Sequence, residues 1–372
     1  MVIPDRAFRR QVRHLELVLD DTRTQAVRRQ IRRDVGALVP PFLLHLPSPA
    51  ALCAYWAIVR EPTHGIHVSR ARKEAVAAAV SAINACPYCV EVHTTVLHAL
   101  GVDAQARDLA GGRGSGSSDP ELDALIAWAR ATRDPDAAIL RQPPFADHEV
   151  AELIGVAVSY HYINRMVALF VVPSPFLIKW APLKAGLRRL AVLAFARQTR
   201  HDVRPGAAVQ LLPPSSLPDD LGWARGNAVI ADAFGRAAAA FDAAGANALP
   251  EPVRSMVTEW VTVWRGEDPG LSRAWLEDAV RPLATDHRPL GRLTLLTALA
   301  PYQIDERLIG EARAHLGPAA DEPLVAACAW ASFTAARRVG TWLAPPRRPQ
   351  PRGQKRMIAR AVTAQEKRDH LL

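Results

Sequence analysis

The stretch SRARKEAVAAAVSAINACPYCVEVHTTVLHALG, residues 69–101, decides the fold of this protein. Ser69 is a good N-cap residue, and the strong helix formers after it place apolar side chains at i, i+4 and i+7 from Val76. Pro87 fits the first turn of a second helix, which is expected to stop near Gly101. The pattern predicts two helices that are joined by a short turn and folded against each other.

The composition of the whole chain also favours helices. Of its 372 residues, 49% are hydrophobic but only 6% are aromatic, and β-branched runs are scarce. Alanine-rich sequences of this kind suit packed helices better than sheets. We therefore expect an all-α protein, long enough for two domains.

Residues with redox chemistry gather in the quoted stretch. Cys86, Cys89 and His93 project from one face of the second helix, because their spacings are three and seven. Glu74 on the first helix could approach the same face. A helix N-terminus favours a thiolate, an imidazole and a carboxylate can carry protons, and a second cysteine can capture a sulfenic acid as a disulfide. These four residues suffice for a redox cycle.

The cysteine pair is also compatible with a metal site or with ordinary core packing. A zinc site could use Cys86, Cys89, His93 and a fourth ligand, but structural zinc usually takes its second ligand pair from another loop, and no second C-x-x-C exists. The two thiols could also be inert core residues. CPYC occurs in glutaredoxin-like proteins as well, where the motif follows a β-strand, whereas sixteen residues of helix-forming sequence precede it here.

The stretch resembles the AhpD-like alkylhydroperoxidases of the carboxymuconolactone decarboxylase family. Glu74, Cys86, Cys89 and His93 meet that family's pattern E-x11-C-x-x-C-x3-H in full, and the resemblance covers roughly residues 45–175. It implies an AhpD-like helical bundle, assembly into homo-oligomers, and reduction of alkyl hydroperoxides without a bound cofactor or metal. Electrons would come from an external dithiol, such as a lipoyl protein.

The resemblance also assigns roles. It makes Cys89 the thiolate that attacks peroxide, Cys86 the resolving cysteine, and Glu74 and His93 the base and a member of a proton relay. Spacing does not order the two cysteines, and the helix terminus by itself favours Cys86. The family prototypes carry a second histidine just before the attacking cysteine. Tyr88 stands there, so we expect a slower or differently routed relay.

The long apolar segment of residues 156–172 carries His161, Asn164 and Arg165 inside it. We expect His161 to be either a hydrogen-bonded core histidine or a supporting contact behind the cysteine pocket. Asn164 and Arg165 are expected to cap or pair within the fold rather than touch substrate. Polar groups inside this run make a membrane span unfavourable, so we predict a buried core helix.

A weak internal repeat divides the chain. Residues 120–132 and 145–175 are echoed by residues 289–301 and 319–346, which predicts a degenerate tandem duplication. The second copy has Ser, Glu and Gly where the first has Glu74, Cys86 and Cys89. The expected parts are a basic N-terminal helical segment (1–44, with one helix over 5–35), an AhpD-like redox domain (45–180), a connecting helix (181–205), a degenerate AhpD-like domain (206–345) and a basic disordered tail (346–372).

The net charge of +9 is concentrated at the two ends, which we interpret as solvated segments that require no nucleic-acid or membrane partner. The first residues lack the apolar core of a signal peptide, so we expect a cytoplasmic protein. Two functions other than peroxide reduction are considered. One is a dithiol-disulfide oxidoreductase that never meets peroxide, and the other is a redox-sensing binding or scaffold protein.

Overall fold

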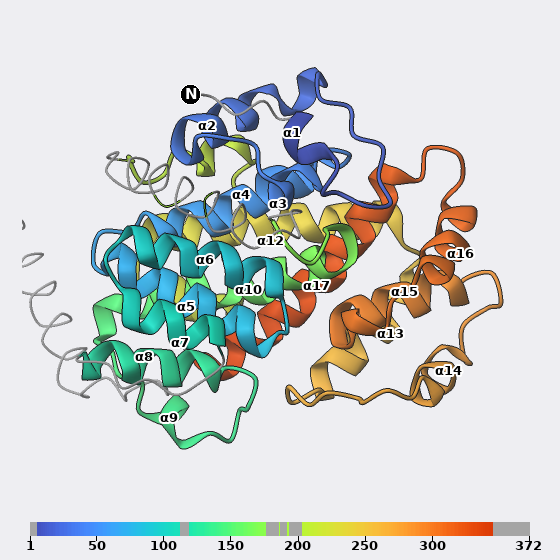
Figure 1. The fold of residues 1–372 in the computed structure, drawn as a ribbon. Helices are drawn as coiled ribbons and strands as arrows, with labels where there is room; N and C mark the ends of the chain where they lie inside the picture. The colour runs from blue at the N-terminus through green and yellow to red at the C-terminus, as the bar shows by residue number, and fades with distance from the viewer. Residues whose placement is uncertain (1–5, 112–118, 176–185, 187–191, 193–202, 345–372) are drawn as a thin grey trace, which may run out of the picture.

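The chain is described by a computed structural model that places residues 6–111, 119–175 and 203–344, together with Gly186 and Val192. These residues form helices and loops. The described part of the chain contains no β-sheet, and its strand-like pairing is limited to an isolated antiparallel bridge between Val12 and Val171. The prediction of an all-α protein is confirmed (Figure 1).

The helices run as follows along the chain. The first half holds α1 (Arg6–Arg9), α2 (Gln25–Val35), α3 (Pro40–Leu43), α4 (Pro49–Thr63), α5 (Arg70–Ile83), α6 (Pro87–Ala99), α7 (Asp103–Gly111), α8 (Pro120–Arg130), α9 (Ala138–Arg141) and α10 (Val150–Phe170). The second half holds α12 (Ala228–Ala248), α13 (Glu251–Val263), α14 (Ala274–Val280), α15 (Arg288–Leu299), α16 (Glu306–Leu316) and α17 (Asp321–Leu343). Short 3-10 turns lie at Thr22–Thr24, Asp147–Glu149, Val209–Leu211, Asp219–Gly226 and Pro301–Gln303.

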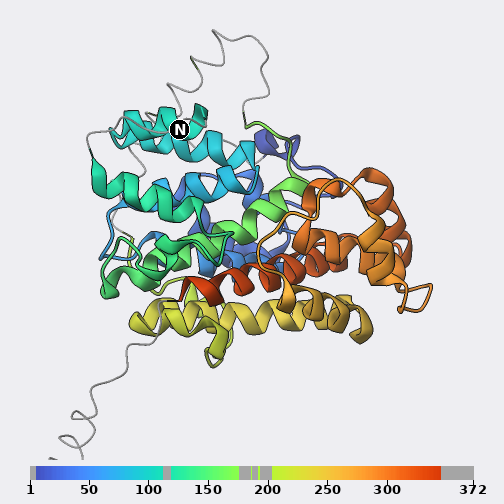
Figure 2. The same ribbon diagram turned by 90° about the horizontal axis from the view of Figure 1, so that it is seen from below.

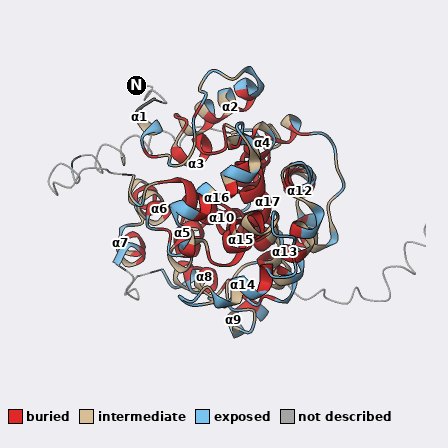
Figure 3. Ribbon diagram, turned by 90° about the vertical axis from the view of Figure 1, so that its right-hand side faces the viewer, coloured by how far each residue is buried: buried red, intermediate tan, exposed pale blue. Residues whose placement is uncertain are grey.

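Four long helices form the centre of the molecule. Helix α4 packs against α12, and α10 packs against α17, while α12 and α17 also contact each other. Figure 2 shows α12 running beneath α17 for most of its length, and Figure 3 shows α10 and α17 buried in the middle of the molecule. Every residue of α10 except Ala168 is buried. The two halves therefore share one hydrophobic core.

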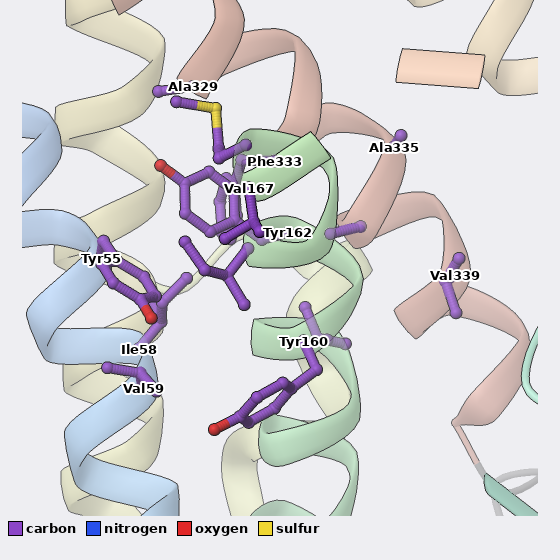
Figure 4. Packing of buried hydrophobic residues seen from close by; sticks show 14 of the residues in the cluster. Tyr55, Ile58, Val59, Tyr160, Tyr162, Val167, Ala329, Phe333, Ala335 and Val339 are labelled. Carbon is purple, nitrogen blue, oxygen red and sulfur yellow. The ribbon is translucent and has the colours of Figure 1, made fainter. Parts of the chain in front are cut away.

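The apolar segment predicted to be a core helix is α10. The segment Asp147–Phe170 is the one helical stretch, among the described residues, with the length and hydropathy to cross a membrane, but 94% of its most apolar window is buried inside the protein. Side chains of α4, α10 and α17 interlock there, with Tyr55, Tyr162 and Phe333 meeting at the centre (Figure 4). The apolar surface of α10 is therefore covered by other helices of the same protein.

The repeat aligns α10 with α17 and α8 with α15. The aligned pair α10 and α17 lies side by side in the core. The duplication and the domain boundaries stay predictions, and the fold adds that each repeat contributes a long helix to a common centre. The connecting helix predicted for residues 181–205 lies largely outside the described residues, and the tail predicted for residues 346–372 lies wholly outside them.

The single helix predicted for residues 5–35 is wrong. The structure has α1, an irregular segment, a 3-10 turn and α2 instead. The chain leaves the helix because it pairs with the end of α10: Arg13 donates its backbone N–H to Phe170 O at 2.8 Å, and Val172 donates to Gln11 O at 2.9 Å. His14 next to this pairing has a left-handed φ of 65°. A tertiary contact here overrides the local preference for a helix.

Candidate functional site

Helices α5 and α6 form the predicted hairpin. Ser69 caps α5 by accepting a hydrogen bond from Arg72 N, and the helix ends at Asn84. Ala85 takes a left-handed φ of 50°, and Cys86 N then donates to Ser81 O at 2.9 Å, which reverses the chain. Cys86 is the N-cap of α6, so both cysteines lie in its first turn.

Glu74 and His93 meet between the two helices. His93 Nδ1 lies 2.6 Å from Glu74 Oε2, and Arg70 Nε donates to Glu74 Oε1 at 2.6 Å. Burial opposes ionisation of Glu74, but Arg70 and then His93 outweigh it and lower the pKa of this carboxyl to about 2. Glu74 is therefore ionised, so Nδ1 of His93 carries a hydrogen that it donates to the carboxylate, and in the neutral form of the ring Nε2 is the proton acceptor.

Cys86 and Cys89 are both buried, and both are free thiols. Their side chains hydrogen-bond to each other. This bond, together with burial, raises the pKa of Cys89 well above its ordinary value. In this structure the site thus holds two reduced sulfurs that share a hydrogen bond, and in this form Cys89 needs a base to reach the thiolate at neutral pH.

Two polar residues that the sequence analysis did not assign to the site reach Cys89. Asn164 on α10 hydrogen-bonds with its side chain and favours its ionised form. Ser81 on α5 lies beside them, but it donates its own hydroxyl hydrogen to Ala77 O at 2.7 Å. Asn164 also binds Asn84 and Ser81, so the expectation that it pairs within the fold is only part of its role. The available signal was its position three residues after His161, on one face of a helix that is otherwise apolar.

The two supporting residues occupy different places. Tyr88 is buried beside both cysteines, and burial, followed by the two cysteines, raises the pKa of its phenol above the ordinary value. His161 contacts neither sulfur directly; it binds Asn84 Nδ2 at 3.1 Å and Thr132 Oγ1 at 2.9 Å. Burial holds the pKa of His161 well below its ordinary value, so its ring is neutral. It connects to Cys89 through the Asn84 and Asn164 amides.

Two tyrosines of the core complete the pocket and were also missed. Tyr160 on α10 packs edge-on against the His93 ring, with centroids 4.7 Å apart. Tyr55 on α4 and Tyr160 both interact electrostatically with Cys89. Figure 4 shows the two rings entering the space between α4 and α10. Burial raises the pKa of each phenol well above its ordinary value, so both stay protonated.

A groove opens beside the cysteine pair, on the side of α6 that faces α7. Its volume is about 600 Å³, and its lining combines apolar and polar surface in similar amounts. The lining residues are Ala82, Ala85, Cys86, Pro87, Val90, Glu91, Thr94, Leu109, Ala110 and Gly111. Because Cys86 belongs to this lining and Cys89 does not, the two sulfurs face different surroundings. The zinc alternative also needs a ligand set, and among the described residues no group of three or more His, Cys, Asp or Glu is arranged to hold a metal ion.

Comparisons with known proteins identify the family. The model of the carboxymuconolactone decarboxylase family matches residues 49–140, which include the whole hairpin. A relative from Mycobacterium tuberculosis (strain ATCC 25618 / H37Rv), named alkyl hydroperoxide reductase Rv2159c, is 39% identical over 314 residues, which are 84% of this chain and 89% of the relative. No solved structure gives a significant match to this chain. The chain is therefore a member of the carboxymuconolactone decarboxylase family, of the AhpD-like kind that its hairpin motif indicated.

Proposed function

We propose that this protein is a thiol-dependent peroxidase that reduces alkyl hydroperoxides through Cys89 and Cys86. The observation that carries the proposal is the geometry of the hairpin, where the ionised Glu74 holds His93 with Nε2 as acceptor on the helix that carries both sulfurs. The name of the relative, alkyl hydroperoxide reductase, supports the same reaction class.

The first step oxidises Cys89. His93 Nε2 takes the proton of the Cys89 thiol, directly or through a water molecule, and the thiolate attacks the terminal oxygen of the hydroperoxide. The S–O bond forms as the O–O bond breaks, and the alkoxide receives a proton from the relay to leave as an alcohol. Cys89 is now a sulfenic acid, and the peroxide has been reduced by two electrons.

The second step closes the disulfide. Cys86 already hydrogen-bonds with Cys89, so its sulfur lies within reach. It attacks the Cys89 sulfur, the S–S bond forms, the S–O bond breaks, and the hydroxyl leaves as water with the Cys86 proton. This capture protects Cys89 from further oxidation.

An external dithiol then restores both thiols. Its first thiolate attacks the disulfide to form a mixed disulfide, and its second thiol displaces the protein sulfur, so the partner leaves as a cyclic disulfide. The groove beside Cys86 supports entry from that side, and its volume of about 600 Å³ and partly apolar lining suit a small dithiol such as a lipoyl group. We also propose that the protein works as a homo-oligomer without a bound cofactor.

Peroxide consumption with dihydrolipoamide as reductant tests this function. Wild type is expected to turn over cumene hydroperoxide repeatedly, whereas Cys89→Ser is inactive, and Cys86→Ser reduces about one equivalent of peroxide per subunit. Cys53→Ser is the matched control, because Cys53 lies on α4 outside the pocket contacts and its thiol has a pKa raised by burial to about 11. Full turnover by Cys89→Ser, or no turnover by wild type, would exclude the proposal.

A dithiol-disulfide oxidoreductase is the second candidate. The position of Cys86 favours it, because Cys86 lines the groove from which a bulky disulfide would approach, whereas Cys89 does not. Rates with a model disulfide and with cumene hydroperoxide, measured under the same conditions, separate the two functions.

A further inference from the structure

A chain of buried polar side chains lies behind Cys89. It consists of Ser81, Asn84, Thr132, His161 and Asn164, and all except Asn84 are at most 1% exposed. Buried polar groups cost free energy unless each has a hydrogen-bond partner. Here the partners are the other members of the chain, which come from three different segments of the helical core. Such a network holds its members in fixed orientations.

The donor and acceptor of each hydrogen bond in this network can be assigned by starting at Thr132, the end that lies furthest from Cys89. The Thr132 hydroxyl donates to Ala129 O at 2.8 Å, so it accepts the bond from His161 Nε2. The neutral His161 ring therefore carries its hydrogen on Nε2, and Nδ1 accepts from Asn84 Nδ2. The second amide hydrogen of Asn84 goes to Asn164 Oδ1 at 3.0 Å.

This arrangement fixes which way the Asn164 amide points. Its oxygen is occupied by Asn84, so its nitrogen faces the other way, where it donates to Ser81 Oγ at 3.0 Å. Ser81 in turn donates to Ala77 O at 2.7 Å. The remaining amide hydrogen of Asn164 is directed to the Cys89 side chain, with which Asn164 hydrogen-bonds.

We propose that Asn164 is a positioning residue for Cys89: its amide, held in one orientation by Asn84, keeps an N–H donor on the sulfur and stabilises the anionic thiolate. This role rests on the proposed function, in which Cys89 must ionise inside a buried pocket. An amide has no proton to lose in the neutral range, so this donor works at every pH at which the protein is folded. The hydrogen bond acts against the effects of Cys86 and of burial, which disfavour the charge.

Other titratable groups on α4, α5, α6 and α10 also lie around the sulfur. Those that interact electrostatically or by hydrogen bonds with Cys89 are Cys86 and Tyr88 on α6, Tyr55 on α4 and Tyr160 on α10. His93 lies one turn further along α6 and pairs with Glu74 on α5. The test must therefore change Asn164 while all of them stay in place.

The test measures the rate at which iodoacetamide alkylates Cys89 between pH 6 and pH 11. The measurement is made in a Cys86→Ser background, so that Cys89 is the one thiol of the pair whose ionisation is followed. Replacing Asn164 by Ala in that background is expected to raise the pH midpoint by about one unit, which slows alkylation about tenfold at pH 7. At pH values above both midpoints the two rates converge. Asn164→Asp, which keeps the shape but loses the donor, is expected to raise the midpoint further.

Ser159→Ala is the matched control. Ser159 is equally buried on the same helix, but its hydroxyl binds only Ile58 O and Gly155 O among the contacts described, so the midpoint should stay unchanged. Asn84→Ala supplies a second variant at the rim of the network, where loss of the orienting bond should give a smaller rise. Unchanged midpoints in the folded Asn164 and Asn84 variants, or an equal rise with Ser159→Ala, would overturn the proposal.

The alkylation assay uses no peroxide, so it judges the role of Asn164 separately from the proposed function. A shifted midpoint in a protein that lacks peroxide turnover supports the positioning role and removes only the peroxidase assignment. Full peroxide turnover with an unshifted midpoint removes the positioning role and leaves the peroxidase assignment in place.

Discussion

His93 Nδ1 lies 2.6 Å from Glu74 Oε2, and this hydrogen bond joins the two helices of the hairpin across nineteen residues of sequence. The bond orients the imidazole and fixes its tautomer, because the carboxylate beside it is ionised. A carboxylate in this position stabilises the imidazole ring as the ring takes up a proton. A neutral amide would stabilise that positive charge less well.

Glu74→Gln removes this charge and keeps the shape. We expect peroxide turnover to fall by about a hundredfold, within the range that general acid-base groups contribute. The rate of peroxide loss at saturating reductant measures the effect. Glu277→Gln, which breaks an exposed ion pair with Arg292 in the second half, is the control and should retain the wild-type rate. Comparable rates for the two variants would show that Glu74 is not in the proton relay.

The same carboxyl makes stability depend on pH. Its pKa is about 2 in the folded protein, below the ordinary value of 4.5, so the folded state favours the ionised form. The resulting stabilisation is fully present above pH 4.5 and is lost as the pH falls towards 2. Between these values the melting temperature of wild type should fall more steeply than that of Glu74→Gln, as followed by circular dichroism. Parallel curves would contradict the assigned charge state.

Lys73 and Glu152 form a buried ion pair that holds the loop before α5. Lys73 Nζ lies 2.7 Å from Glu152 Oε2, and the carboxylate also accepts from His67 N and Val68 N. Lys73→Met leaves this buried charge without its cation, so we expect a loss of about 3 kcal/mol or more in the free energy of unfolding. The double variant with Glu152→Gln should recover much of that loss, because the amide side chain is neutral and still accepts hydrogen bonds. Urea unfolding of both variants measures the difference.

Gly266 lets the second half approach the end of α8. Its φ is +92°, and an added Cβ would collide with the backbone oxygen of Arg133. The carbonyl of Gly266 accepts from Arg133 Nε at 3.1 Å and from Nη2 at 2.9 Å. Gly266→Ala should therefore destabilise the protein by about 2 kcal/mol or more. Thermal unfolding of this variant and of Gly270→Ala separates the steric collision from the cost of a positive φ. Gly270 has a φ of +78° but open space around it, so its replacement should destabilise the protein less.

The division into halves predicts a fragment experiment. In the intact chain, α4 packs on α12 and α10 packs on α17, so residues 1–180 by themselves would expose both contact faces. We expect this fragment to lack a cooperative thermal transition, because its core helices lose their partners. A sharp transition near that of the full chain would show that the first half is an independent domain.

Local features of the hairpin could be predicted because each depends on neighbours in sequence. The cap at Ser69, the proline at position 87 and the stop at Gly101 all lie where the sequence placed them. The meeting of Glu74 with His93 followed as well, since two helices joined by a short turn bring those faces together. The N-terminal segment was mispredicted because its helix-forming residues pair instead with the end of α10, which lies far along the chain.

The sequence by itself determined the helical class of the protein and the identity of its cysteine, histidine and glutamate constellation, because capping, propensity and spacing act over a few residues. Only the tertiary structure decided that Asn164, Tyr55 and Tyr160 surround Cys89, that Cys86 faces the groove, and that both halves share one core. The physical reason is burial, because a polar group on an apolar helix must find its hydrogen-bond partner on a helix that packs against it. Asn84 and Asn164 are such partners although they lie about eighty residues apart in the sequence, and no local pattern encodes their pairing.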